Sequence, residues 1–407
     1  MNSKLIATLI FLLPLTSVIK LGETDLWYSH YFFSSFFLFS FLAFRLWKLN
    51  VFLSLFAGWV VFNSYWVASH HPRSFLTLVQ FMGGCYLAYA ISFFNKPQRK
   101  NIVYALLGAF ILQSIMMALQ AFGVDPIFKD ITNPGNDVVV GLSASMNQFG
   151  LYMADMGPVV LSVFPYFWPL AVIGTMLSKT TFAFAGLMVG SMFYLFKTYK
   201  TKFIIDKYQA AFLAILLAVV FFLKFDVPSR WVAEERMLVW KNSIMQVEAE
   251  KAEMTVFEKN NVSVTRYLTC SKWTGFGFGN FMRVSPYTQL SYLPQNYDNA
   301  TLRSRGIHVY EHAHNDYVEV YFDLGRIGFL LMFLLVGSVF YFYITAKEKS
   351  IQLTAYFSAL LAHLVTATGI YTVHTALSGM MLAVLYGLFM GEIKNNGKTP
   401  KLGTGRA

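Results

Sequence analysis

The sequence is poor in cysteine and in charged residues, and each shortage excludes a class of protein. Only 2 of the 407 residues are cysteines, so the chain is not a small disulfide-stapled scaffold and has no CxxC zinc pattern. Cys85 lies in an apolar stretch and Cys270 in a polar one, so we expect them at different depths and predict no disulfide between them. Charged residues make up 13% of the chain, against about 25% in an average soluble domain. The chain is therefore not an ordinary soluble protein.

Hydrophobic residues account for 56% of the chain and aromatic residues for 18%, which predicts an integral membrane protein. The formal net charge is +11, but the basic residues form short clusters between apolar runs. That arrangement is typical of membrane topology rather than of a nucleic-acid-binding surface. We therefore expect contacts with membrane lipids and no nucleic-acid partner.

Apolar runs long enough to cross a bilayer recur along the chain. A spanning helix needs about 20 apolar residues, and we predict an all-α, polytopic helix bundle with about twelve transmembrane helices. The first run follows Lys4 as a signal peptide would, but no Ala-x-Ala cleavage site follows it, so we keep it as a span. The predicted spans are residues 5–19, 28–44, 51–68, 75–94, 103–122, 144–164, 165–177, 180–196, 210–225, 324–346, 353–371 and 375–393.

The lysines and arginines of the short connecting segments concentrate on the side of the N-terminus. This distribution predicts that both termini are cytoplasmic. Four regions follow: transmembrane helices 1–9 in residues 1–225, a large external loop in 226–323, helices 10–12 in 324–393, and a basic cytoplasmic tail in 394–407. The loop is the predicted segment with room for extramembrane structure.

Two stretches of this loop carry recognisable patterns. Residues 230–258 read as an amphipathic helix, in which Arg236 and Trp240 lie on one face. Residues 275–281 read Gly-Phe-Gly-Phe-Gly-Asn-Phe, which predicts a tight turn with aromatic anchors. This stretch is not a dinucleotide fingerprint, because the spacing and the strand-turn-helix context are missing.

Residues 314–328 form a polar stretch that runs directly into an apolar one. If a helix begins at His314, it has two faces. One carries His314, Tyr317, Tyr321, Gly325 and Gly328, and the other carries Asp316, Glu319, Asp323 and Arg326. The glycine edge would let another backbone come close. The alternative is a juxtamembrane helix whose acidic side faces water and whose histidine only packs.

The spacing of His314-Asn315, nine residues, then Gly325-x-x-Gly328 resembles a motif of the O-antigen ligase and Wzy-type polymerase family. The resemblance covers residues 140–393 and includes the Arg-x-x-x-Trp and glycine-rich patterns. Two weaker similarities are Ser-Met-Asn-Gln at 145–148 and Ser-Lys-Thr-Thr at 178–181. Family members usually carry a Ser-Arg pair at the second place, where this chain has Lys179.

The resemblance implies a GT-C-like glycosyltransferase of the bacterial inner membrane whose active face is periplasmic. It would transfer a glycan from a polyprenyl diphosphate carrier to a hydroxyl of a lipid or glycan acceptor. Cations must hold the diphosphate, and arginine suits phosphate best. The candidates are Arg236, Arg266, Arg303, Arg305 and Arg326, with Lys179. Each of them has the alternative of binding lipid headgroups or an acidic neighbour.

The reaction also needs a base, and histidine titrates near neutral pH. His314 is the first candidate, Glu311, Asp316 and Glu319 are alternatives, and Asn315, Gly325 and Gly328 have structural roles in the motif. His312 with His314 and Glu311 lacks a further zinc ligand at a known spacing. Because bound cations stabilise the leaving diphosphate, we expect no metal and no cofactor.

Several functions remain open. A ligase would use lipid A-core as acceptor and a polymerase another carrier-linked repeat unit. A transporter or flippase would carry paired polar groups near mid-span, and a scaffold would leave the arginines and histidines unexplained. Asp155 and His363 lie inside predicted spans, where they either line a polar path or pair structurally.

Overall fold

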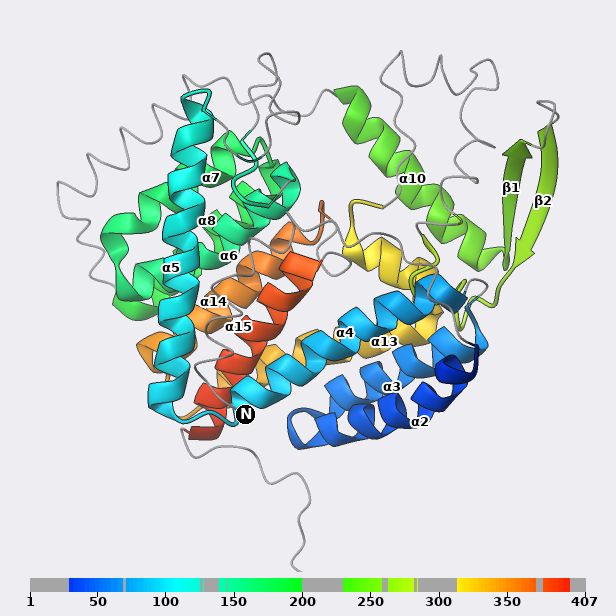
Figure 1. Ribbon diagram of the computed structural model, residues 1–407, viewed down its shortest axis with the longest axis horizontal. Coiled ribbons are helices and arrows are strands. Elements are labelled where there is room, and N and C mark those ends of the chain that lie inside the picture. The colour runs from blue at the N-terminus through cyan, green and yellow to red at the C-terminus, as the bar shows by residue number, and fades with distance from the viewer. Residues whose placement is uncertain are drawn as a thin grey trace, which may run out of the picture. The chain divides into compact units, whose positions relative to one another are not determined.

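The computed structural model describes residues 29–68, 71–124, 127, 139–143, 145–199, 230–257, 263–281, 284, 313–370 and 376–395. These residues form eleven α-helices, two short 3-10 helices and one two-stranded sheet (Figure 1). They fold as two compact units. Unit 1 comprises Met1–Thr24, Gly84–Val227 and Val339–Ala407, and unit 2 comprises Asp25–Gly83 and Pro228–Ser338.

The helices follow the apolar runs of the sequence. In chain order they are α2 Ser29–Arg45, α3 Val51–Trp66, α4 His71–Ser92, α5 Lys96–Ala121, α6 Met146–Val163, α7 Trp168–Leu177, α8 Thr181–Tyr199, α10 Arg230–Glu248, α13 Asp316–Thr345, α14 Ile351–Thr366 and α15 Ala376–Asn395, with the 3-10 helices Leu46–Lys48 and Pro165–Phe167. Ten of the predicted spans thus coincide with helical structure, while spans 5–19 and 210–225 lie outside the described residues.

Four described helical segments have the length and composition to cross a membrane. They are Ser74–Ser92, Lys96–Ala121, Thr181–Thr198 and Asp316–Thr345, and shorter apolar helices accompany them at Val51–Trp66, Pro165–Leu177 and Ile351–Thr366. The chain is therefore a membrane protein with several candidate transmembrane helices. The number of spans and the fourfold division of the chain stay predictions.

The predicted helix over 230–258 is too long. It ends at Glu248, and Glu250 adopts a left-handed φ of 55° that stops it. Strand β1 (Lys251–Phe257) follows and pairs antiparallel with β2 (Ser263–Thr269), with Lys251 opposite Thr269. Its Thr-Val-Phe end favours a strand over a helix. The helical fold class is confirmed for the rest of the described chain, and this hairpin is an addition that we did not predict.

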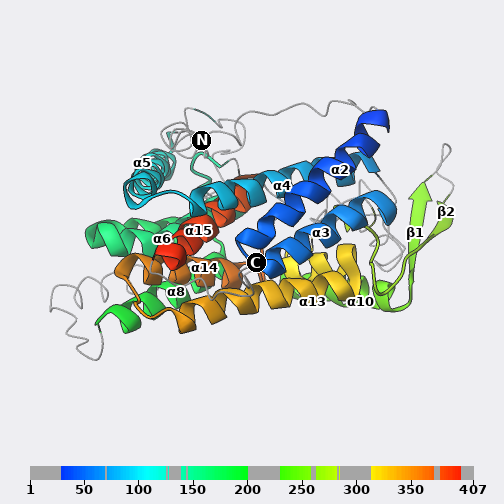
Figure 2. The ribbon, with the colours of Figure 1, turned by 90° about the horizontal axis from the view of Figure 1, so that it is seen from below.

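In unit 1, helix α6 packs against α7, α8 and α14, and Figures 1 and 2 both show α8 beside α14. Glycines make the approach of α8 to α14 close. A Cβ added at Gly186 would lie 2.5 Å from the Ala362 carbonyl oxygen, and one at Gly190 would lie 2.5 Å from that of Ser358. Small residues of this kind let membrane helices pack backbone to backbone.

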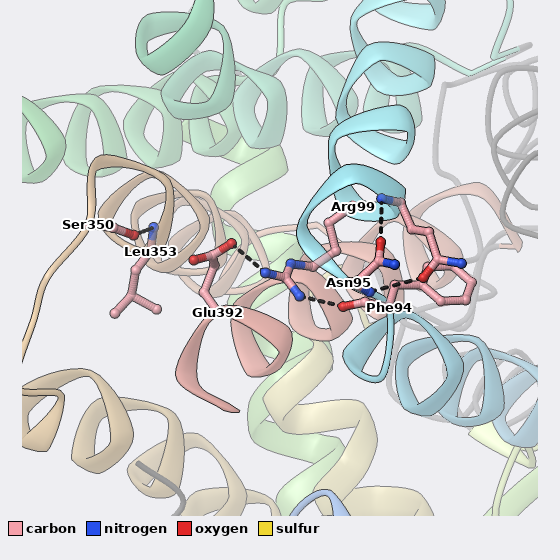
Figure 3. A network of polar contacts seen from close by, with 7 residues as sticks. Phe94, Asn95, Arg99, Ser350, Leu353 and Glu392 are labelled. Atoms are coloured by element: carbon pink, nitrogen blue, oxygen red, sulfur yellow. Dashed lines mark hydrogen bonds and ion pairs between the residues drawn. The ribbon is translucent and has the colours of Figure 1, made fainter. Parts of the chain in front are cut away.

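A buried polar network fastens the start of α5 to the end of α15 within unit 1 (Figure 3). Arg99 is 2% exposed, and its Nη2 lies 3.0 Å from Glu392 Oε1. Its Nη1 donates to the Phe94 carbonyl oxygen, while Asn95 caps α5 through a capping box with Gln98. The cation is thus neutralised where it is buried, as its desolvation requires.

In unit 2, helix α3 lies beside α13, as Figures 1 and 2 show. Asn50 Nδ2 donates to Ser338 Oγ at 2.6 Å, and Trp59 Nε1 donates to the Leu324 carbonyl oxygen at 3.2 Å. Helix α10, the strands and the start of α13 share one hydrophobic core. Its buried members are Val239, Val247, Ala252, Phe276, Phe281, Val284, Ala313, Val318 and Phe322.

Candidate active site

The turn that carries His314 is built by its neighbours. Helix α13 begins at Asp316, and Asn315 caps it: the Asn315 Oδ1 accepts from the backbone N–H groups of Tyr317 at 3.0 Å and Val318 at 3.2 Å. The half-buried His314 precedes this cap with a φ of 50°. The helix therefore begins at Asp316 and not at His314, as the two-face interpretation assumed, because asparagine is a strongly preferred N-cap.

The acidic side of α13 is buried, so the alternative in which it faces water is also wrong. Asp316 is 3% exposed, Glu319 0% and Asp323 1%. The Glu319 Oε2 accepts a hydrogen bond from the Ala313 N–H at 3.3 Å. A buried carboxylate needs such donors, and this one fixes the backbone immediately before His314.

Helix α10 reaches the same turn. The Trp240 Nε1 donates a hydrogen bond to the carbonyl oxygen of the buried Ala313. Arg236 lies one helical turn before Trp240 on the same face of α10. Its Nε is buried and has no hydrogen-bond partner among the described residues. Trp240 and Ala313 are 73 residues apart in the sequence, and their hydrogen bond brings the Arg-x-x-x-Trp motif next to the His-Asn motif.

Residues 271–281, here named the glycine loop, fold tightly against α13. Gly275, Gly277 and Gly279 have φ angles of 70°, 108° and 75°. The three phenylalanines at 276, 278 and 281 are at most 4% exposed. The predicted tight turn with aromatic anchors is confirmed, and its rings belong to the core of unit 2 rather than to an exposed surface.

The glycine loop bonds to a break in α13. Gly325 has φ 63° and ψ −165°, outside the helical region. On one side of the break Phe276 N donates to Phe322 O at 3.0 Å, and on the other Ile327 N donates to Trp273 O at 3.2 Å. A Cβ at Gly325 would lie 2.5 Å from Gly275 N. The predicted close approach of another backbone is confirmed here, whereas the predicted unbroken helix is not.

Gly328 has a different neighbour. A Cβ at this position would collide with the side chain of Leu324, which precedes the break in the same element. The second glycine of the motif therefore makes room for the bend itself, not for the glycine loop.

Arg326 is occupied by an acidic neighbour, the alternative that we left open for each arginine. Its Nε lies 3.1 Å from Glu248 Oε1 and its Nη2 contacts Oε2, while the Tyr321 hydroxyl donates to Oε1. The guanidinium also lies over the Trp273 ring, 5.5 Å from its centroid. The Arg326 and Tyr321 donors lower the pKa of Glu248. The contacts of Glu248 with Arg326 and Tyr321 join the end of α10 to α13 beside the break.

Asn63 of α3 is a residue that the sequence analysis missed. It is 0% exposed, its Nδ2 donates to the Thr274 carbonyl oxygen at 2.6 Å, and its Oδ1 accepts from the Phe278 N–H at 2.6 Å. The available signal was an amide near the end of an otherwise apolar span, where a polar group needs a partner.

Lys179 belongs to unit 1. It lies exposed in the turn between α7 and α8 with a φ of 54°. The hydroxyls of the adjacent Ser178 and Thr180 share a hydrogen bond of 2.5 Å. A Cβ at Gly150 of α6 would lie 2.6 Å from Ser178 Oγ, so this turn packs on the start of α6. The segments of the two weaker motifs are therefore neighbours.

The remaining candidates are less fully placed. The backbone of Arg266 lies in β2 opposite Met254. Arg303, Arg305 and Glu311 lie outside the described residues. Asp155 and His363, which we left between a polar path and a structural pair, are hydrogen-bonded to each other: His363 Nδ1 lies 2.7 Å from Asp155 Oδ2, and both side chains are at most 2% exposed.

Comparison with known families gives a match. Residues 167–333 match a family whose description is O-antigen ligase. Residues 167–333 are thus similar to an O-antigen ligase domain. No curated protein matches the chain. The matched region runs from the 3-10 helix before α7 into the apolar part of α13, and it includes Lys179, Arg236, the glycine loop and the His314 turn.

The matched family is described as O-antigen ligase, an enzyme family, and the match covers less than half of the chain. The family resemblance that the His-Asn and glycine motifs suggested is thereby confirmed. The two patterns that we placed in a single external loop each hydrogen-bond to the start of α13 or the turn before it: Trp240 to Ala313, and Phe276 to Phe322.

Proposed function

We propose that the protein is a membrane glycosyltransferase that moves a glycan from a polyprenyl diphosphate carrier to a hydroxyl of lipid A-core. The observation that carries the proposal is the hydrogen bond from Trp240 to the Ala313 carbonyl oxygen. It ties the helix that carries Arg236 to the turn that carries His314, so a phosphate-binding cation and a base belong to one folded unit.

In the proposed reaction, His314 takes the proton of the acceptor hydroxyl. The acceptor oxygen attacks the anomeric carbon of the donor sugar from the side opposite the diphosphate, and the carbon–oxygen bond to the diphosphate breaks. The configuration at this carbon is inverted. The diphosphate leaves as an anion, and the proton stays on the histidine until solvent removes it. A histidine with its ordinary pKa of about 6.5 is suited to this step near neutral pH.

Cations hold the leaving group in this proposal. Guanidinium groups grip phosphate oxygens in pairs and stabilise the negative charge that develops on them. With enough cations no metal ion and no cofactor is needed. We assign this role to Arg236, Arg266, Arg303 and Arg305. The partnerless Nε of Arg236 among the described residues supports its place in the set, and the ion pair with Glu248 removes Arg326 from it.

Burial supports His314 as the base over its described rivals. A base must come within hydrogen-bond reach of the hydroxyl that it deprotonates. Asp316 and Glu319 are 3% and 0% exposed, and Glu319 accepts a hydrogen bond from the backbone. His314 is half-buried in the turn before α13, where a substrate would reach it more readily than the buried carboxylates.

We propose further that the protein lies in the bacterial inner membrane with both termini cytoplasmic. The reaction would then occur at the periplasmic face, where α10 and the His314 turn would stand above the lipid. The distribution of lysine and arginine supports this orientation. The carrier lipid would enter from the membrane, and the acceptor from the same leaflet.

The test uses cells in which the chromosomal gene is replaced by variants. His314→Ala, Arg236→Ala and Arg303→Ala should abolish long-chain surface glycan while the protein stays in the membrane at its normal level. Lys241→Ala is a matched control for Arg236→Ala, because Lys241 is an exposed cation on the same helix. Normal glycan in the His314 and arginine variants would refute the site.

A deletion strain separates the acceptors. Core without polymer, together with accumulated carrier-linked polymer, indicates a ligase. Core that carries a single repeat unit indicates a polymerase. Accumulation of carrier-linked units on the cytoplasmic side would indicate a transporter and would refute the proposed reaction.

A further inference from the structure

We propose that Asp323 is a positioning residue for the reaction: through the glycine loop, it fixes the direction of the short helix segment that begins at Asp316, directly after the His314 turn. This inference rests on the proposed function, because it concerns the placement of the proposed base. Asp323 lies nine residues after His314 and touches neither that histidine nor, in our proposal, the substrate.

Both carboxylate oxygens of Asp323 are used by the glycine loop. Oδ2 accepts from the Gly279 N–H at 2.7 Å and Oδ1 from the Phe281 N–H at 2.9 Å. The side chain is 1% exposed. Burying a carboxylate is costly unless donors surround it, so an apolar residue would serve better if this position only filled space. The two hydrogen bonds make Asp323 a fixed link between α13 and the loop.

The glycine loop is itself held from a second side. Asn63 of α3 donates to the Thr274 carbonyl oxygen and accepts from the Phe278 N–H, both at 2.6 Å. The loop therefore contacts α3 through the buried Asn63 amide, and it contacts α13 through the buried Asp323 carboxylate in addition to the backbone hydrogen bonds beside Gly325. The loop thus holds residues 316–324 of α13 at a fixed position relative to α3.

The break at Gly325 explains why the contact of Asp323 with the glycine loop affects the orientation of residues 316–324. Residues 316–324 are separated from the apolar part of α13 by a non-helical residue, so the long helix does not set their direction. Nine helical residues span about 13 Å, and a tilt of about 5° at the break moves the far end by about 1 Å. A misplacement of about 1 Å can lower a catalytic rate by about 10²-fold.

Hydrogen exchange of the full-length protein in lipid nanodiscs tests the link directly. Asp323→Asn keeps the shape of the side chain but leaves it one acceptor oxygen, so one loop N–H loses its partner. We expect exchange to rise at least 10-fold at the amides of residues 276–281 and also at those of residues 313–319. Faster exchange in the loop with an unchanged turn at 313–319 would overturn the proposal.

Ser338→Ala is the matched control. It removes the hydrogen bond from Asn50, which also joins α3 to α13 but lies on the far side of Gly325. We expect normal exchange at residues 313–319 in this variant, and a rise equal to that of Asp323→Asn would overturn the proposal. If Asp323→Asn does not accumulate in the membrane, Asn63→Leu replaces it, with the same two readouts and a smaller rise.

Kinetics then relate placement to turnover. With a polyprenyl-diphosphate-linked glycan isolated from cell membranes as donor, Asp323→Asn should lower kcat about 10²-fold and leave KM for the donor nearly unchanged. A normal kcat beside a loosened turn would overturn the positioning role. Full activity of His314→Ala would instead refute the proposed function, and the exchange data would still decide whether Asp323 fixes the turn.

Discussion

Replacing Gly325 by alanine should break the junction between α13 and the glycine loop. The residue has φ 63° and ψ −165°, a combination that only glycine adopts readily. The new methyl group would lie 2.5 Å from Gly275 N and from the Trp273 carbonyl carbon. These are backbone atoms, so no side-chain rotation relieves the contact, and the loop must move away.

The size of the effect follows from two contributions. The backbone conformation costs about 1–3 kcal/mol for a residue with a Cβ. Moving the loop strains hydrogen bonds such as the one from Arg326 N to Lys272 O, which is 2.9 Å long, and each lost bond costs about 1 kcal/mol. With one or two bonds lost, we expect about 2–5 kcal/mol of destabilisation.

Gly337→Ala is the control on the same helix. Nothing lies within 4 Å of a Cβ at Gly337, which needs no positive φ, and alanine favours a helix over glycine by about 1 kcal/mol. The assay is the midpoint of thermal unfolding of the purified protein in detergent. Gly325→Ala should lower it clearly and Gly337→Ala should not. Equal midpoints for both variants would refute the claim that the contact between α13 and the glycine loop requires glycine at position 325.

Three further predictions concern other contacts. The pKa of Glu248 is lowered from 4.5, so its contacts with Arg326 and Tyr321 stabilise the fold above about pH 4.5 and lose this effect as the pH falls through the lowered pKa. Glu248→Gln should therefore be less stable than wild type at pH 7 and equally stable at low pH, as measured by limited proteolysis. Trp240→Phe should lower stability by about 1–3 kcal/mol, measured by thermal unfolding, because the buried carbonyl of Ala313 loses its donor; an unchanged midpoint would contradict this. His363→Ala should destabilise by about 3–5 kcal/mol because it leaves Asp155 buried without its partner, whereas Asp155→Leu combined with His363→Leu should recover most of the loss; additive effects in a double-mutant cycle would show that the two residues do not interact.

The sequence was sufficient for the parts of the fold that depend on local pattern. Long apolar runs predicted the helices, because a segment inside the bilayer needs apolar side chains and must satisfy its backbone hydrogen bonds within the helix. The alternating glycines at 275–281 predicted a tight turn, and His314-Asn315 with Gly325 predicted the family. In each case the signal lies within one short stretch of the chain.

The parts that failed depend on contacts between distant residues. A helical period from His314 to Arg326 did not show that Asn315 would cap the helix or that the glycine loop, about 50 residues earlier, would open it at Gly325. The sequence alone allowed the acidic side of this helix to face water, whereas in the structure the glycine loop covers Asp323. The partners of buried polar groups are set by tertiary structure, which periodicity does not encode.

The most direct test of the account is the initial rate of glycan transfer by purified wild-type and His314→Ala protein. The donor is a polyprenyl-diphosphate-linked glycan, and the acceptor is lipid A-core. Loss of a general base lowers a rate by about 10²–10⁴-fold, so we expect a decrease of this size with an unchanged thermal midpoint. A wild-type rate in His314→Ala would contradict the account.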